Sequence, residues 1–288
     1  MVEPPSTARP LLACTRGPAR RARAVAAAIA LCALAPLAAS PVRAQGWPQP
    51  AAGLSVTGDP EILFTFDDGP NPNTTPKILD TLREYGVQAV FFNVGRMLER
   101  PEALALVERI IAEGHIIANH TMRHGELCRI KEEEAVAEID EGYRVLHQAA
   151  AMPIPWFRTP YGARCSRLDA QLAARRVTHF HWDIDPQEWR HGNAKRTIAY
   201  LTRVLGQAQG REVVLMHDTK QATVKALPAV LQWIREENVR REAEGRRQIR
   251  IVPASQYAME TLAPGLWKWM KDVAPGPQWG SYLAQVLP

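Results

Sequence analysis

The sequence predicts an α/β protein in which helices cover a parallel sheet. Strand-like apolar runs alternate with longer segments of helical periodicity, which is typical of βα units. The strand-like runs lie at 62–66, 88–93, 115–118, 155–158, 177–182, 212–216 and 249–252. The helical segments lie at 74–85, 101–113, 131–149, 167–175, 194–208 and 222–240. Seven strands suit either a closed or nearly closed barrel or an open doubly wound sheet. No Gly-rich phosphate loop follows any of these strands, which argues against a nucleotide-binding fold.

The first 44 residues have the pattern of a secretory signal peptide. An apolar stretch at 24–39 is followed by Val42-Arg43-Ala44, a small-residue cleavage pattern. A group of arginines directly precedes the apolar stretch: Arg16, Arg20, Arg21 and Arg23. The apolar part is too short to cross a bilayer comfortably, so we expect no stable membrane span after cleavage. The mature chain would begin near Gln45 and function in the periplasm or outside the cell.

Length and charge limit the remaining possibilities. The chain has 288 residues, enough for one large domain or two small ones, and its net charge of +5 is mild. The basic residues of segment 235–250 are interleaved with glutamates, a pattern typical of a solvated helix face rather than of a nucleic-acid surface. We therefore expect no nucleic-acid partner. Segment 45–60, rich in Pro, Gly and Ala, is interpreted as a linker.

The first predicted strand ends in the hexapeptide Thr65-Phe66-Asp67-Asp68-Gly69-Pro70. The apolar run before it delivers two adjacent carboxylates, and Gly69-Pro70 then turns the chain sharply. Adjacent residues at a strand end point in different directions. One acid can therefore bind a metal while the other faces a substrate.

The third predicted strand runs into two histidines, His120 and His124. Two histidines four residues apart on a helical turn share one face and can bind the same metal ion. Together with Asp68 they supply three protein ligands and leave a position open for water, as catalytic metal sites do. This donor set suits zinc, although cobalt or nickel could also occupy it.

Three further strand ends carry polar residues. The fourth ends in Arg158-Thr159-Pro160-Tyr161, and an arginine beside two carboxylates would hold Asp67 ionised and oriented. The fifth leads into segment 182–189, which contains Asp183, Asp185, Glu188 and Trp189. The sixth ends at His217, which suits a general acid titrating near neutral pH. Active sites of βα barrels lie at the carboxyl ends of the strands, where all of these residues fall.

After removal of the signal segment the chain has two cysteines, Cys128 and Cys165. In an oxidising compartment they can form a disulfide. The sequence equally allows two inert, half-buried thiols. A cysteine-based zinc site is not expected, because there is no CxxC pair.

These motifs, in this order, resemble the five motifs of the polysaccharide deacetylases, the NodB-homology carbohydrate esterases of family 4. The motifs are Thr65–Pro70, His120–His124, Arg158–Tyr161, Trp182–Trp189 and Leu215–His217. The resemblance covers roughly residues 60–260 and implies a distorted (β/α)7 barrel over residues 61–262, after the signal peptide and linker. Segment 263–288 would be a tail that packs on this domain or, as the less favoured alternative, presents its aromatic side chains to sugar rings. The family binds a divalent metal, usually zinc, and removes N- or O-acetyl groups from polysaccharides.

The resemblance also implies a role for each matching residue. Asp68, His120 and His124 match the metal ligands. Asp67 matches the catalytic base, Arg158 the residue that tethers it, and His217 the general acid. Four residues would contact the substrate or the oxyanion, the latter through the Tyr161 backbone N–H: Tyr161, Pro160, Trp189 and Leu215.

One position departs from the family pattern. The acid that tunes the histidine is usually an Asp directly before the Trp, whereas this chain has Glu188, one methylene longer. Either Glu188 reaches the same partner, or Asp185 or Asp183 replaces it.

The resulting expectation is an exported, monomeric, metal-dependent deacetylase that acts on an N-acetylglucosamine polymer such as peptidoglycan or a chitin-like glycan. An O-acetyl esterase acting on xylan or an exopolysaccharide is the alternative within the enzyme class. A noncatalytic carbohydrate-binding homologue is the alternative outside it.

Overall fold

The structure is a computed structural model that describes residues 59–152, 154 and 156–262. The predicted signal peptide at 1–44, all but the last two residues of the predicted linker at 45–60, and the predicted tail at 263–288 lie outside the described residues. None of the helices in the described part of the chain is both long and apolar enough to cross a membrane.

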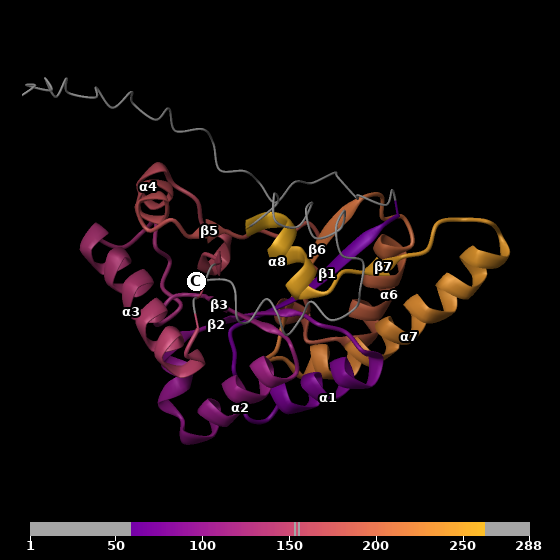
Figure 1. Ribbon diagram of the computed structural model, residues 1–288, viewed down its shortest axis with the longest axis horizontal. Coiled ribbons are helices and arrows are strands. Elements are labelled where there is room, and N and C mark those ends of the chain that lie inside the picture. The colour runs from indigo at the N-terminus through magenta and orange to yellow at the C-terminus, as the bar shows by residue number, and fades with distance from the viewer. Residues whose placement is uncertain (1–58, 153, 155, 263–288) are drawn as a thin grey trace, which may run out of the picture. The chain divides into compact units, whose positions relative to one another are not determined.

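The described residues form one parallel sheet of seven strands (Figure 1). The strands are β1 (Glu61–Asp67), β2 (Val90–Asn93), β3 (Ile116–Asn119), β4 (Trp156–Phe157), β5 (Thr178–His179), β6 (Arg211–His217) and β7 (Arg250–Ile251). Their order is β5-β4-β3-β2-β1-β6, and β7 pairs with the first residues of β1. The prediction of an α/β protein on a parallel sheet is confirmed.

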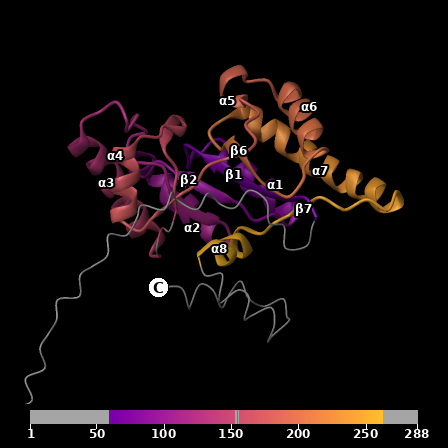
Figure 2. The same cartoon turned by 90° about the horizontal axis from the view of Figure 1, so that it is seen from above.

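Helices follow the strands, and those from α1 to α7 cover the outside of the sheet (Figures 1 and 2). The longer ones are α1 (Thr75–Tyr85), α2 (Pro101–Ala112), α3 (Glu132–Ala150), α4 (Ser166–Ala174), α6 (Ala194–Leu205), α7 (Gln221–Ala243) and α8 (Ala254–Leu262). Three short pieces complete the set: η1 (Gly95–Glu99), η2 (Pro160–Gly162) and α5 (Glu188–His191). The sequence predicted neither α8 nor these short helices, which hold too few residues to give a clear helical period.

The sheet curls into a distorted barrel, and the chain after β5 links its two edges. The predicted fifth strand, 177–182, forms only the two residues of β5. The chain then leaves β4 and reaches β6, where Ile184 forms an isolated parallel bridge with Val214. The Ile184 carbonyl accepts a hydrogen bond of 2.9 Å from the Leu215 N–H. Of the two topologies that seven strands allowed, the structure adopts the barrel.

The two faces of β1 have different partners. Ile62, Phe64 and Phe66 belong to the apolar cluster that packs against the covering helices. Leu63 belongs to a second cluster that also contains Trp156, Phe180 and Tyr257. Because side chains alternate along a strand, Thr65 and Asp67 share the face of Leu63, the inside of the barrel. The second cluster includes residues of α8, which therefore packs against the inner face of the sheet.

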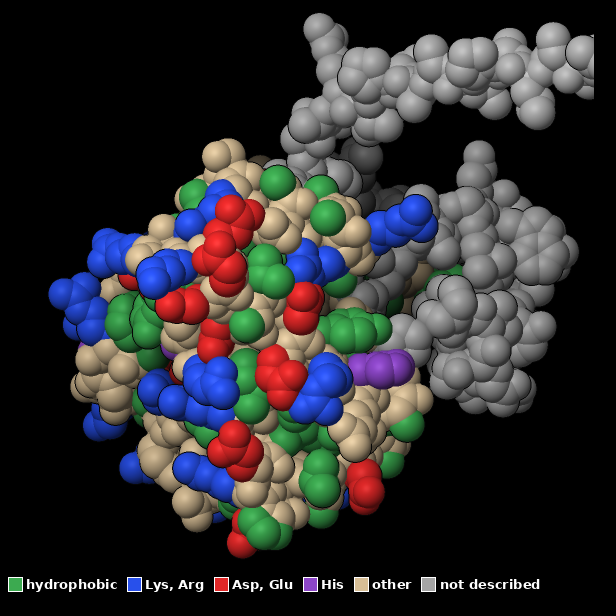
Figure 3. Space-filling view, turned by 90° about the vertical axis from the view of Figure 1, so that its left-hand side faces the viewer, with side chains coloured by type: hydrophobic (Ala, Val, Ile, Leu, Met, Phe, Trp, Pro, Cys, Tyr) green, Lys and Arg blue, Asp and Glu red, His purple; other side chains and the backbone are tan. Residues whose placement is uncertain are grey.

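Charges of both signs are interspersed on the face of the molecule that Figure 3 shows. Helices α3 and α4 lie on this side in Figure 1. Ion pairs connect Asp140 of α3 with Arg175 at the end of α4, and Glu141 with Arg144 within α3. Such mixed charge makes no extended basic surface on this face.

Candidate active site

The register between β1 and β6 brings two predicted site residues side by side. Asp67 ends β1, His217 ends β6, and the two are direct Cα partners in the parallel ladder. Two residues earlier, Thr65 pairs with Leu215, whose side chain is buried on the same inner face. The alternation of β1 therefore points the Asp67 carboxylate to the interior, where it is almost completely buried.

Arg158 holds the Asp67 carboxylate. Its Nη1 atom lies 2.6 Å from Oδ1 of Asp67 and also donates a 2.9 Å hydrogen bond to the Thr65 hydroxyl. The guanidinium is fully buried and stacks 4.0 Å from the ring centroid of Phe92. A buried, charge-assisted contact of this kind fixes the orientation of a carboxylate.

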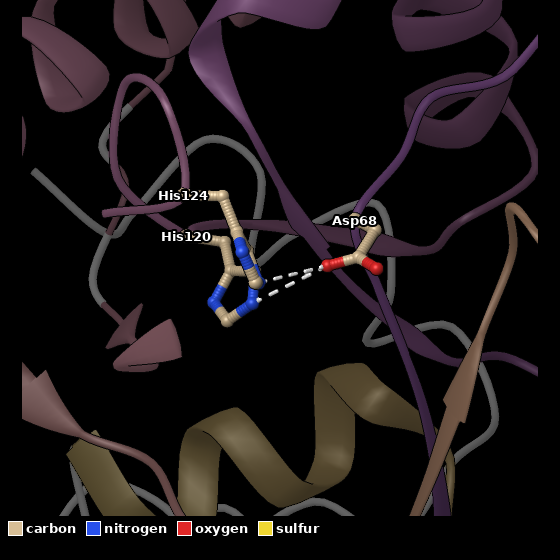
Figure 4. A group of neighbouring side chains, drawn as sticks. All are labelled: Asp68, His120 and His124. Atoms are coloured by element: carbon tan, nitrogen blue, oxygen red, sulfur yellow. Dashed lines mark ion pairs between the residues drawn. The ribbon is translucent and has the colours of Figure 1, made fainter. Parts of the chain in front are cut away.

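Asp68, His120 and His124 converge on one point, as Figure 4 shows. Their candidate ligand atoms all lie within 4.8 Å of one another. Oδ1 of Asp68 is 3.2 Å from Nε2 of His124 and 3.7 Å from Nε2 of His120. The three residues come from two loops at the carboxyl ends of β1 and β3.

The expectation that the two histidines share a helical turn is wrong. Segment 120–130 has no helix in the structure, and both Thr121 (φ 70°) and His124 (φ 64°) are left-handed. The Thr121 hydroxyl accepts a 2.8 Å hydrogen bond from the His124 N–H and holds this loop. The loop brings the two rings together, with centroids 4.9 Å apart.

The donor set fits a divalent metal. Oδ1 of Asp68 is buried and makes no hydrogen bond within the described residues. The Nδ1 atom of His120 lies 2.7 Å from the Arg158 carbonyl, which leaves Nε2 directed at Asp68. Metal-binding histidines are usually oriented by such a second contact. Burial would raise the pKa of Asp68, but the His124 contact and the other nearby histidines lower it well below its usual range. One carboxylate oxygen and two imidazole nitrogens are typical zinc ligands.

Tyr161 lies beside this group in a strained conformation. Its φ is 61°, a left-handed value that is uncommon for a bulky residue. Its backbone N–H has no hydrogen-bond acceptor within the described residues. The ring is 69% exposed and packs edge-on against His124, with centroids 4.7 Å apart. Pro160, which precedes it in η2, is buried.

Glu188 is the acid that contacts His217. Its Oε1 atom lies 2.9 Å from Nδ1 of His217 and accepts a 2.8 Å hydrogen bond from the His217 N–H. Burial would lower the pKa of His217, but the hydrogen bond and the charge of Glu188 raise it above its ordinary value. The alternative acids lie elsewhere: Asp183 accepts from the Val213 N–H, and Asp185 from the Gln187 N–H.

Trp189, the next residue, borders the site. Its ring centroid is 6.4 Å from that of His217, and 47% of the residue is exposed. Tyr161 and Trp189 are thus exposed aromatic rings against two different site histidines, His124 and His217. Exposed aromatic side chains offer apolar contact area to a ligand.

Sequence reasoning missed three residues that support the site. Thr65 bonds the arginine, Thr223 donates a 3.2 Å hydrogen bond to Glu188, and Asp218 is a fully buried carboxyl group. Burial and the nearby acids raise the pKa of Asp218 to about 7. Thr65 is part of the first motif and Asp218 directly follows His217, and these positions were the only signals for the two residues. Nothing in the sequence signalled Thr223.

The two cysteines pair in the structure. Cys128 and Cys165 form a disulfide with a Cα–Cα distance of 6.1 Å. Each follows a site residue by four positions, His124 and Tyr161 respectively. The bond therefore joins the loop that contains His124 to the loop that contains Tyr161.

Comparison with known proteins places this parallel α/β barrel among the carbohydrate deacetylases. The model of the polysaccharide deacetylase family matches residues 55–178. A chitooligosaccharide deacetylase from Bradyrhizobium is 36% identical over 165 residues, which span 57% of this chain and 73% of the relative. The chain belongs to the polysaccharide deacetylase family.

Two further relatives are peptidoglycan enzymes. A peptidoglycan-N-acetylglucosamine deacetylase from Bacillus cereus is 34% identical over 188 residues, which span 62% of this chain and 65% of the relative. The solved structure of peptidoglycan deacetylase PdaC from Bacillus subtilis has a TM-score of 0.60 and 25% identity, covering 75% of this chain and 98% of that one. The expected family and fold class are confirmed.

Proposed function

We propose that this protein is an exported, metal-dependent deacetylase that hydrolyses N-acetyl groups of a glycan containing N-acetylglucosamine, such as peptidoglycan or a chitin-like polymer. One observation carries the proposal. The Asp68–His120–His124 group lies next to an acid held by Arg158, and a histidine held by Glu188 stands beside that acid. Hydrolysis of an amide needs these three functions in one place: activation of water, a base and an acid.

Asp68, His120 and His124 would hold the metal, with zinc the best match to the donors and cobalt or nickel also suitable. When bound, such an ion polarises a carbonyl oxygen and lowers the pKa of water. The remaining chemistry belongs to the side chains and backbone of the chain.

Asp67 is assigned as the general base. It takes a proton from the water that attacks the acetyl carbonyl carbon, and the contact with Arg158 fixes the orientation of its carboxylate. The carbonyl carbon becomes tetrahedral and its oxygen gains negative charge. The unpaired N–H of Tyr161 is assigned to donate to this oxygen.

His217 is assigned as the general acid. It protonates the sugar nitrogen as the carbon–nitrogen bond breaks, so that a free amine and acetate leave the site. Glu188 stabilises the imidazolium form that gives up this proton. Leu215 and Trp189 are assigned to the acetyl group and the sugar, and Pro160 to the shape of the Tyr161 loop.

The substrate class follows from the relatives. The matched relatives are named for chitooligosaccharide and peptidoglycan, and both polymers carry N-acetyl groups. The signal-peptide pattern of residues 1–44 supports export from the cytoplasm. Such polymers are found outside the cytoplasm. We also propose a linker at 45–60, a catalytic domain at 61–262, a tail at 263–288 and a monomeric protein.

Acetate release from a panel of glycans tests the proposal. The panel holds a chitin oligomer, peptidoglycan and an O-acetylated xylan, each with and without a chelator, and Asp67→Asn is the inactive control. We expect release from the first two, loss with chelator and recovery with added zinc. Release from xylan alone would replace the N-acetyl assignment with an O-acetyl esterase. No release from any glycan, with glycan binding retained, would identify a noncatalytic carbohydrate-binding protein.

A further inference from the structure

Asp218 is a buried carboxyl group that the proposed reaction does not use. It follows His217 directly, and none of its surface is exposed. Its Oδ2 atom accepts a 2.6 Å hydrogen bond from the Thr75 hydroxyl, while Oδ1 has no partner within the described residues. A buried carboxyl group with one hydrogen bond is unfavourable for stability. Its presence therefore calls for a physical reason.

Thr75 connects this carboxyl group to the loop after the two adjacent acids. It is the first residue of α1, and its hydroxyl donates to Asp218 while accepting a 2.8 Å hydrogen bond from the Asn71 N–H. Asn71 comes just after Gly69-Pro70. Asp218 thus holds, through one hydroxyl, the far end of the loop that begins at Asp68.

The near end of the same loop also contacts Asp218. The Asp218 N–H donates a 3.2 Å hydrogen bond to the carbonyl oxygen of Asp67. Gly69 packs against the carboxyl group so closely that a Cβ atom there would lie 2.0 Å from Oδ2. Asp218, which directly follows β6, therefore contacts the residues on both sides of Asp68.

Asp68 needs such support because its backbone is strained. Its φ is 76°, in the left-handed region that favours glycine. A non-glycine residue in a sparsely populated conformation of this kind is strained and persists only where its surroundings fix it. The contacts of Asp218 lie on the two flanks of this residue, at Asp67 and at Gly69.

We propose that Asp218, acting through Thr75, is a positioning residue that fixes the Asp68 loop for metal binding. The inference rests on the proposed function, because it assumes that Asp68 is a metal ligand. It gives a role to the Thr75 hydroxyl, which bonds both Asp218 and the Asn71 N–H. It also explains why position 69 is a glycine: no side chain fits between the loop and the carboxyl group.

The test is a calorimetric titration of Zn²⁺ alone into metal-free protein. Thr75→Val removes the hydroxyl and keeps the shape of the side chain. Thr197→Val is the matched control, since Thr197 is also fully buried and its hydroxyl bonds the Asn193 carbonyl at the start of α6 rather than a residue of the Asp68 loop. We expect Thr75→Val to weaken Zn²⁺ binding about 10–100-fold, as loss of an outer contact to a metal ligand typically does. Thr75→Ser and Thr197→Val should bind within about threefold of wild type, inside the usual scatter of such measurements.

Two variants of Asp218 separate the hydrogen bond from the charge. Asp218→Asn keeps an acceptor for Thr75 and should retain Zn²⁺ affinity, whereas Asp218→Ala should lose as much as Thr75→Val. An equal loss of Zn²⁺ affinity in Asp218→Asn and Asp218→Ala would show that the hydrogen bond to Thr75 does not position the loop. If Thr75→Val and Thr197→Val lower the melting temperature alike and both keep Zn²⁺ affinity, Asp218 is merely structural. Wild-type protein that binds no Zn²⁺ would instead refute the proposed function.

Discussion

The main-chain carbonyl of Arg158 lies 2.7 Å from Nδ1 of His120. The side chain of the same arginine lies 2.6 Å from Asp67. One residue at the end of β4 therefore orients the assigned base with its guanidinium and a candidate metal ligand with its backbone. Its own N–H bonds the Asn119 carbonyl at 3.0 Å, so its position depends on the β3–β4 ladder rather than on a flexible loop.

Arg158→Lys should separate these two contacts. The substitution keeps a positive charge but loses the planar guanidinium, whose Nη1 atom bonds both Thr65 and Asp67. The other two nitrogens, which bond the carbonyls of Phe180 and His181 and hold the group in place, are lost as well. We expect kcat to fall about 100-fold, the scale of a mispositioned catalytic group. Zn²⁺ affinity should stay near wild type, because the carbonyl that faces His120 belongs to the backbone. A variant that loses zinc along with activity would contradict this division.

His120→Ala and His124→Ala test the metal ligands. Each removes one of three donors, so tight metal binding and acetate release should be lost together. Metal content of the purified variants, measured by mass spectrometry, reports the first and acetate release the second. His147→Ala is a suitable control, since His147 lies in α3 and its ring contacts the Met152 carbonyl rather than a candidate metal ligand. Stoichiometric metal in both site variants would show that the ligands are assigned wrongly.

The two adjacent acids should respond differently to the same change. Asp67→Asn should keep the metal and lose several orders of magnitude in kcat, because the attacking water loses its base. Asp68→Asn should chiefly weaken metal affinity, because its Oδ1 faces both histidines. Comparing Zn²⁺ titration with kcat at saturating zinc distinguishes them. The opposite pattern would mean that base and ligand are exchanged.

The strand ends could be predicted from the sequence, because each is a short apolar run followed at once by polar residues. That pattern placed Asp67 and His217 at the same end of one sheet, but only the structure shows that they are direct partners on neighbouring strands. Spacing was a poorer guide to local conformation. The interval between His120 and His124 suggests a helical turn, but left-handed backbones at Thr121 and His124 bring the rings together instead.

Contacts between segments far apart in the chain could not be predicted from the sequence. Thr75 and Asp218 are 143 residues apart, and no periodicity relates them. The bridge from Ile184 to Val214, which links the edges of the barrel, depends on the chain leaving its strand after two residues. Choosing Glu188 over Asp183 and Asp185 likewise required knowing where each carboxylate points.

The disulfide should stabilise the fold and the site together. Replacing Cys128 and Cys165 by serine should lower the free energy of unfolding by about 2–4 kcal/mol, since the bond restricts the unfolded chain. Chemical denaturation of the oxidised protein and the double variant measures this difference. A thiol titration of the native exported protein should find neither cysteine free. Two titratable thiols would contradict the pairing.

Glu188 should set the alkaline limit of activity. His217 must be protonated to act as an acid, and Glu188 raises the pKa of His217, which extends activity to higher pH. Glu188→Gln removes the charge, so the pKa should fall and the alkaline limb of the kcat profile should move to lower pH.

Two variants give this prediction its controls. Glu188→Asp keeps the charge and should place the alkaline limb close to wild type, provided that the shorter side chain still reaches Nδ1 of His217. Asp185→Asn should not move the limb, because Asp185 bonds the Gln187 N–H rather than the histidine. A limb that moves in Asp185→Asn and stays in Glu188→Gln would make Asp185 the tuning acid. The 2.9 Å contact between Glu188 and His217 is the reason to expect the reverse.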